Sequence, residues 1–164
     1  MGKVNIGYSE IIDNVGMILK YFSGKRLVGK EIVDSSSNIV NEYFRFAVCE
    51  ADKVLLREFI EESCSWLDLQ LGSYGGGYDM KTDVITFTLV PTALPEPSRV
   101  RSVEVAIRSA LTRRVALHWL LLAGYEGLDT IEEDCSYLVA RLLTMLEASS
   151  RSFAVPTQRP VPPF

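Results

Sequence analysis

Residues 52–71 read DKVLLREFIEESCSWLDLQL, and their apolar side chains recur with the period of an α-helix. The positions on this stripe are Leu55 or Leu56, Phe59 or Ile60, Ser63, Trp66 or Leu67, and Leu71. Asp52 stands where an N-cap residue belongs, and Gly72 stands where a left-handed residue ends many helices. The stripe is wide enough for a core helix, so the segment predicts one over residues 52–71.

A glycine cluster follows this helix, in the stretch LGSYGGGYD at residues 71–79. Because glycine adopts backbone conformations that other residues avoid, the cluster predicts a helix stop and a flexible loop. A phosphate-binding loop would need a strand before it, a helix after it and a Lys-Ser/Thr pair, and none of these accompanies the glycines. The cluster therefore does not predict phosphate chemistry.

The next segment, DVITFTLV at residues 83–90, alternates with a period of two. Ile85, Phe87 and Leu89 fall on one side, and the β-branched content is typical of a strand. Three prolines in residues 91–98 end this strand and lead to a new helix after Ser98.

Further helices are predicted on either side of these elements. They cover residues 9–22, with Ser9 as N-cap, residues 99–123, and a last segment whose start is a capping box of Thr130 and Glu133. The positions expected to face the core are Ile11, Val15, Ile18 or Leu19, Phe22, Val103, Ile107, Ala110 or Leu111, Leu117 or His118, Leu121, Leu128, Ile131, Cys135, Leu138, Leu142 and Met145.

These segments together predict a mainly α-helical fold: a small helical bundle with a short β insert at about 83–90 and an extended proline-rich C-terminal tail. Residues 1–152 are expected to form a single helical domain, in which the packing of residues 1–50 is left open. Residues 42–48, EYFRFAV, fit either a strand or the lead-in to a helix. Residues 153–164, FAVPTQRPVPPF, contain four prolines, a composition typical of polyproline-like extension.

Composition narrows the functional classes. A formal net charge of −4 and a pI near 5.1 argue against a dedicated nucleic-acid binder, which usually presents a basic face. The longest apolar run, VALHWLLLAG at residues 115–124, is too short to span a bilayer, and the first residues lack the apolar segment of a signal peptide. We expect a protein that stays inside the cell and does not enter the membrane.

The residues that most often carry chemistry give no enzyme signature. Cys49, Cys64 and Cys135 are dispersed and form no metal-ligand spacing, so neither a zinc site nor a disulfide framework is predicted. The lone histidine, His118, lies on an apolar helix, where a hydrogen-bonded core or interface histidine is the commoner role. The carboxylates of Glu58, Glu61 and Glu62 lie within one turn, but they occupy the polar side of a helix next to an arginine. We predict no catalytic, cofactor-binding or metal-binding residue.

Two features point instead to contacts with other proteins. Arginines gather on the helix predicted at 99–123, and the acidic net charge favours protein carboxylates over phosphates as their partners. The proline-rich segment 153–164 is suited to strapping onto a neighbouring subunit or binding a proline-recognition module.

The pattern from Asp52 onward resembles the small helical head–tail connector proteins of tailed bacteriophages and prophages, also called adaptor or head-completion proteins. In that family a capped acidic helix is followed by a helix of the form A-I-x-x-A-L…A-L-x-W and by a last helix with Tyr-Leu near its start. The matching residues here are Ala106, Ile107, Ala110, Leu111, Ala116, Leu117, Trp119, Tyr137 and Leu138. The resemblance covers about residues 52–147, and it is carried by apolar spacing.

The resemblance implies a structural virion protein without catalytic residues or cofactors. Copies would form a homo-oligomeric ring below the portal, in the neck of the virion, after assembly in the host cytoplasm. Portal and tail proteins would be its partners, with non-specific proximity to the packaged DNA. The candidate inter-subunit contacts are Tyr74, Tyr78, Arg113, Arg114, Phe153, Pro156, Pro160 and Phe164. The alternative from the sequence is a bacterial helical adaptor or regulatory module that binds one protein partner.

Overall fold

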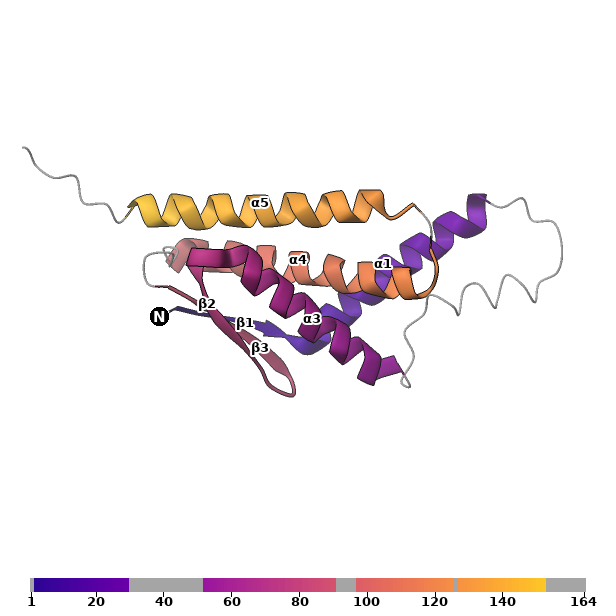
Figure 1. Ribbon diagram of the computed structural model, residues 1–164, viewed down its shortest axis with the longest axis horizontal. Helices are drawn as coiled ribbons and strands as arrows, with labels where there is room; N and C mark the ends of the chain where they lie inside the picture. Colours follow the sequence, from indigo (N-terminus) through magenta and orange to yellow (C-terminus); the bar gives the residue numbers. More distant parts are fainter. Residues whose placement is uncertain (1, 30–51, 91–96, 126, 153–164) are drawn as a thin grey trace, which may run out of the picture.

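The computed structural model describes residues 2–29, 52–90, 97–125 and 127–152 (Figure 1). Over these ranges the protein is mainly helical with a small antiparallel sheet, so the predicted fold class is confirmed. The helices are α1 (Tyr8–Gly29), α3 (Lys53–Leu71), α4 (Pro97–Leu122) and α5 (Asp129–Ser152). The predicted element at 42–48 and the tail at 153–164 lie outside the described residues.

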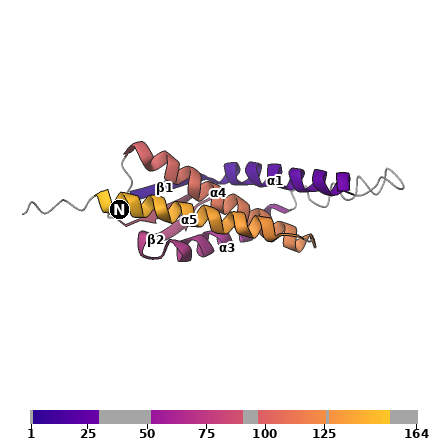
Figure 2. The same cartoon turned by 90° about the horizontal axis from the view of Figure 1, so that it is seen from above.

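Helix α4 is the centre of the molecule, and α1, α3 and α5 all pack against it. Figure 2 shows α1 on one side of the α4–α5 pair and α3 with the sheet strand β2 on the other. The buried side chains of α4 therefore point to several sides of the helix; those in its described part are Val103, Ala106, Ile107, Ala110, Leu111, Thr112, Val115, Ala116, Leu117, Trp119 and Leu120. Leu121 was predicted to be in the core but is 54% exposed, because it faces solvent on the last turn of the helix.

The sheet consists of β1 (Gly2–Gly7), β2 (Gly75–Met80) and β3 (Val84–Leu89) in the order β1-β3-β2. Both pairings are antiparallel. One face carries buried residues from β1 and β3, namely Val4, Ile6, Ile85, Phe87 and Leu89. The alternation expected for residues 83–90 is thus confirmed, and it turns the apolar side of β3 toward the helices.

The glycine cluster was predicted to be a flexible loop, and this prediction is wrong beyond the helix stop. Gly72 does end α3, with a φ of 52°, but residues 75–80 form strand β2, paired with β3. Pairing satisfies the backbone N–H and C=O groups that a flexible loop would leave to water. A side chain at Gly76 would come within 3.3 Å of Thr88, and Gly77 has a φ of 96° beside an irregularity in the β2–β3 register. Glycine therefore serves here to fit a bulged strand.

Residues 2–21, whose packing the sequence left open, belong to the packed structure. Strand β1 lies beside β3 in the sheet, and the side chains of Ile11, Val15 and Leu19 on α1 are buried. Helix α1 packs against the central helix α4. The N-terminal segment is therefore part of the core formed by α4 and the sheet.

Of the three helix starts predicted from capping residues, the position of Asp52 directly before α3 is confirmed, whereas the starts predicted at Ser9 and Thr130 differ from the structure. Helix α1 begins at Tyr8, directly after β1, so Ser9 lies inside the helix. Asp52 has a helical backbone and makes no side-chain capping hydrogen bond. Helix α5 begins before Thr130, and its first bonded backbone N–H groups donate to the carbonyl of Leu128.

The buried face of α5 is also rotated slightly from the predicted one. Leu142 is fully buried as expected, but Leu138 and Met145 are half-buried, whereas Val139 and Leu146 are buried. The apolar stripe is wide enough to allow either orientation, and packing against α4 selects one of them.

Candidate functional site

The candidate contact residues that the structure describes lie in three different places. Tyr74 and Tyr78 lie beside α3, Arg113 lies between α1 and α5, and Arg114 lies between α3 and α5. The other candidates lie outside the described residues; they are Phe153, Pro156, Pro160 and Phe164. The structure therefore does not gather the four described candidates into one site.

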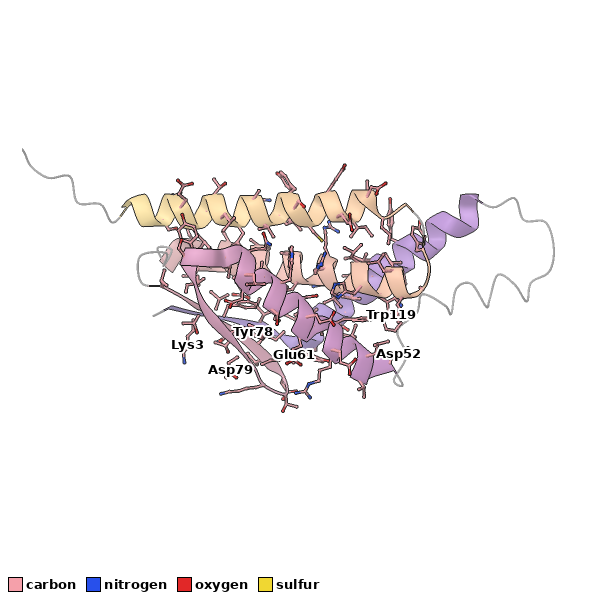
Figure 3. All side chains as sticks on the ribbon, viewed as in Figure 1. Lys3, Asp52, Glu61, Tyr78, Asp79 and Trp119 are labelled. Atoms are coloured by element: carbon pink, nitrogen blue, oxygen red, sulfur yellow. The ribbon has the colours of Figure 1, made fainter. Side chains whose placement is uncertain are left out.

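Tyr78 links strand β2 to helix α3 through packing and hydrogen bonds. Its ring packs against Phe87 with centroids 5.9 Å apart, and its Oη lies 2.7 Å from Ser65 Oγ. The same hydroxyl donates to the backbone carbonyl of Glu61 at 3.5 Å. Figure 3 shows Glu61 and Tyr78 beside each other on this side of the molecule. Tyr78 thus contacts the outer surface of α3. We call this surface, with the exposed residues Glu58, Glu61, Ser65 and Leu69, the α3 flank.

A groove of about 650 Å³ runs between α1, α4 and α5, away from the α3 flank. Its apolar lining includes Met17, Ile18, Tyr21 and Ile131, and its polar lining includes Asn14, Arg108, Ser109, Thr112, Arg113, Thr130 and Asp134. Met17 and Tyr21 are 62% and 60% exposed, so much of the apolar lining is accessible from solvent. The sequence did not predict this groove, because it forms only where α1 meets α4 and α5, which lie much later in the chain.

Two arginines of α4 line the groove, and each is held by a carboxylate of a neighbouring helix. Arg108 Nη1 donates to Glu10 Oε2 at 2.6 Å, and Arg113 Nε lies 3.4 Å from Asp134 Oδ2. An arginine carries five N–H donors in a fixed planar arrangement, so one carboxylate leaves donors for a second acceptor. The groove therefore combines apolar surface with oriented cationic donors, which suits a protein segment carrying apolar and acidic side chains.

Thr112 adds an unsatisfied group to the groove. It is 4% exposed, and its Oγ1 has no hydrogen-bond partner among the described residues. A buried hydroxyl without a partner is unfavourable by about 1–3 kcal/mol. A ligand or partner group that reached this hydroxyl would relieve that penalty.

Arg114 turns away from Arg113, toward α3. Its Cζ lies 5.0 Å from the centre of a Trp66 ring, a cation–π arrangement. Its Nε is buried and has no hydrogen-bond partner among the described residues. Arg114 is therefore a packing residue between helices in the isolated chain.

His118 lies on the same side of α4 and faces α3. Its Nδ1 is 3.4 Å from Glu62 Oε2, and its ring meets Phe59 edge-on at 5.5 Å. Burial lowers the pKa of His118 below the ordinary value of 6.5, the Arg114 cation lowers it further, and the Glu62 carboxylate opposes them. Because Glu62 is largely exposed, water screens its charge. His118 is thus neutral at pH 7 and packed against an aromatic ring.

The described cysteines are buried thiols. Burial raises the pKa of Cys64 to about 12 and that of Cys135 to about 11, so neither is a thiolate at neutral pH. Cys49 lies outside the described residues. In the part of the chain that the structure describes, the His, Cys, Asp and Glu side chains form no cluster of three or more able to hold a metal ion.

None of the described helices has the length and apolar content needed to cross a bilayer. The apolar run of residues 115–124 belongs instead to the buried centre of the fold and the end of α4.

Comparisons with protein-family models, with curated proteins and with solved structures find no match.

Proposed function

We propose that this chain is a structural virion protein, a head–tail connector whose copies form a ring below the portal and join the capsid to the tail. The observation that carries the proposal is the placement of two chemically different surfaces on opposite sides of a rigid helical centre. The α3 flank lies on one side of α4–α5, and the groove lies on the other. A ring of identical subunits needs two different, complementary surfaces, because each copy contacts one neighbour with each.

The chemistry of the described residues is consistent with a structural role. Helices of 26 and 24 residues form the central pair, and such elements supply rigidity to a channel wall. His118 is neutral and packed, and the thiols of Cys64 and Cys135 are protonated. In this proposal the tail at 153–164 contacts the portal or a neighbouring copy, and the protein resides in the virion neck.

The test is to purify the full chain and examine it by light scattering and negative-stain microscopy, alone and with the portal protein encoded in the same genome. The proposal expects rings, alone or on the portal. A chain lacking residues 153–164 should keep its unfolding midpoint and bind the portal less tightly. A compact dimer that ignores the portal would contradict the proposal and favour the alternative, a helical adaptor or regulatory module.

A further inference from the structure

The outer face of α3 carries a row of exposed side chains, and near the middle of this row Ser65 is hydrogen-bonded to Tyr78 of β2. Val54, Glu58, Glu61, Ser65 and Leu69 are spaced by three or four residues, so they lie on one face of the helix. Val54 and Leu69, at the two ends of the stripe, are 72% and 79% exposed. Neither glutamate side chain has an ion-pair partner in the described ranges. We call these five residues the α3 stripe.

An exposed stripe of this composition favours a particular kind of partner. Burying apolar side chains such as Val54 and Leu69 is favourable, and the glutamates between them favour a surface with cationic donors. Arg57 is exposed next to the stripe and partly offsets its negative charge. The partner surface should therefore alternate apolar positions with only a few cations.

The groove of the same protein has this composition. Met17 and Tyr21 present exposed apolar surface, and Arg108 and Arg113 present guanidinium groups on α4. Each arginine is held in place by one carboxylate of its own chain. The N–H donors that this carboxylate leaves unused are therefore already oriented when a second acceptor binds. Glu10 and Asp134 balance the charges of these two arginines, so the groove offers the glutamates of the stripe free N–H donors rather than a net positive charge, together with apolar surface for Val54 and Leu69.

Helices α1 and α3 lie on opposite sides of the α4–α5 pair (Figure 2), so the groove that α1 borders and the stripe on α3 do not meet within one molecule. We propose that the α3 stripe of one copy docks in the α1–α4–α5 groove of the next copy. This is a helix-in-groove contact between different surfaces, so it propagates head to tail. The inference rests on the proposed function in one respect: a head-to-tail contact of this kind gives a ring when the chain of copies closes on itself, as the connector function requires.

Two sets of substitutions separate the two halves of the contact. The stripe variant is Glu58→Lys with Glu61→Lys, which reverses the charge of two exposed side chains. The groove variant is Met17→Glu with Arg113→Gln. Its new carboxylate repels the glutamates of the stripe, and its glutamine keeps a hydrogen-bond donor for Asp134. The matched control is Asp79→Lys with Asp83→Lys, which makes the same charge change on the exposed β2–β3 hairpin. Circular dichroism and urea unfolding show whether each variant stays folded.

The measurement is sedimentation velocity of the full chain, from micromolar to millimolar concentration. We expect the native chain and the control to associate, more weakly at about 500 mM than at about 50 mM salt, because salt screens exposed charge pairs. Each surface variant alone should associate at least about tenfold more weakly. Mixing the two variants should restore association, because the mixture contains one intact stripe and one intact groove.

A native chain that stays monomeric at millimolar concentration would overturn the inference. So would surface variants that associate like the native chain, or a loss of association caused only by removing residues 153–164, which would make the tail the occupant of the groove. Rings that persist in both variants would refute this contact and leave the connector function standing. Open filaments that depend on both surfaces and ignore the portal would support the contact and refute the connector function.

Discussion

Arg108 Nη1 donates a hydrogen bond to Glu10 Oε2 at 2.6 Å, joining the middle of the central helix α4 to the first turn of α1. Glu10 follows strand β1 closely, and its side chain also approaches Gly7. The pair thus connects the N-terminal segment to residues nearly a hundred positions later in the chain. Both side chains are partly exposed, so the pair contributes about 1 kcal/mol or less, and the buried residues of β1 and α1 supply most of the attachment.

Truncating Ile6 should therefore destabilise the whole fold. Ile6 is fully buried in strand β1, and an Ile→Ala change in a core typically lowers the free energy of unfolding by about 2–5 kcal/mol. Urea unfolding followed by circular dichroism measures the change. Lys3→Ala on the exposed side of the same strand is the control and should change the stability by less than about 0.5 kcal/mol. Equal effects of the two substitutions would show that β1 is not part of the core.

Two glycines should respond to alanine in opposite directions. Gly77 has a φ of 96°, which an L-residue rarely adopts, so Gly77→Ala should lower the free energy of unfolding by about 1–3 kcal/mol. Gly16 lies in helix α1 with open space around its missing Cβ, so Gly16→Ala should raise it by about 0.5–1 kcal/mol. Thermal unfolding of the two variants, measured side by side, gives both signs. A neutral Gly77→Ala variant would argue against the bulged β2 strand.

His118 should make folding stability depend on pH in a known direction. Burial and Arg114 lower its pKa in the folded state, so the unfolded chain binds the proton more readily. Stability from this group is fully present above pH 6.5 and is lost as the pH falls from there through the lower pKa of the folded state. His118→Gln should flatten this part of the pH profile between about pH 7.5 and 5.5.

The titration of His118 can be followed directly, since it is the only histidine in the sequence. Its imidazole proton resonances should titrate below pH 6.5 in the folded protein. A titration midpoint above that value would show that Glu62 dominates and that the sign of the pH dependence is reversed.

The buried thiols should be unreactive until the protein unfolds. Because burial raises the pKa of Cys64 to about 12 and of Cys135 to about 11, thiolate is scarce at pH 8 and reagents have little access. In a Cys49→Ser variant, which leaves these two cysteines, an aromatic disulfide reagent should label them only in denaturant. The labelling rate should follow the unfolding equilibrium across a urea series. Rapid labelling of the native variant would contradict the packing of α3 and α5 against α4.

The sequence by itself determined the helical class, the helix over 52–71 with its stop at Gly72, and the strand near 83–90. Each is encoded locally: the helix by apolar period, the stop by a glycine with positive φ, and the strand by β-branched alternation that buries Ile85, Phe87 and Leu89. Local periodicity sets the type of an element, because it depends only on which side chains share a face.

Only the tertiary structure decided where these faces meet. Pairing with β3 made a strand of the glycine-rich residues 75–80, and packing on α4 turned Val139 inward in place of Leu138. It also sent Arg113 into the groove and Arg114 toward Trp66, although the two are adjacent in sequence. The reason is physical: the groove forms where α1 meets α4 and α5, which lie much later in the chain, and the free energy that brings these helices together comes from burying contacts that no local pattern encodes.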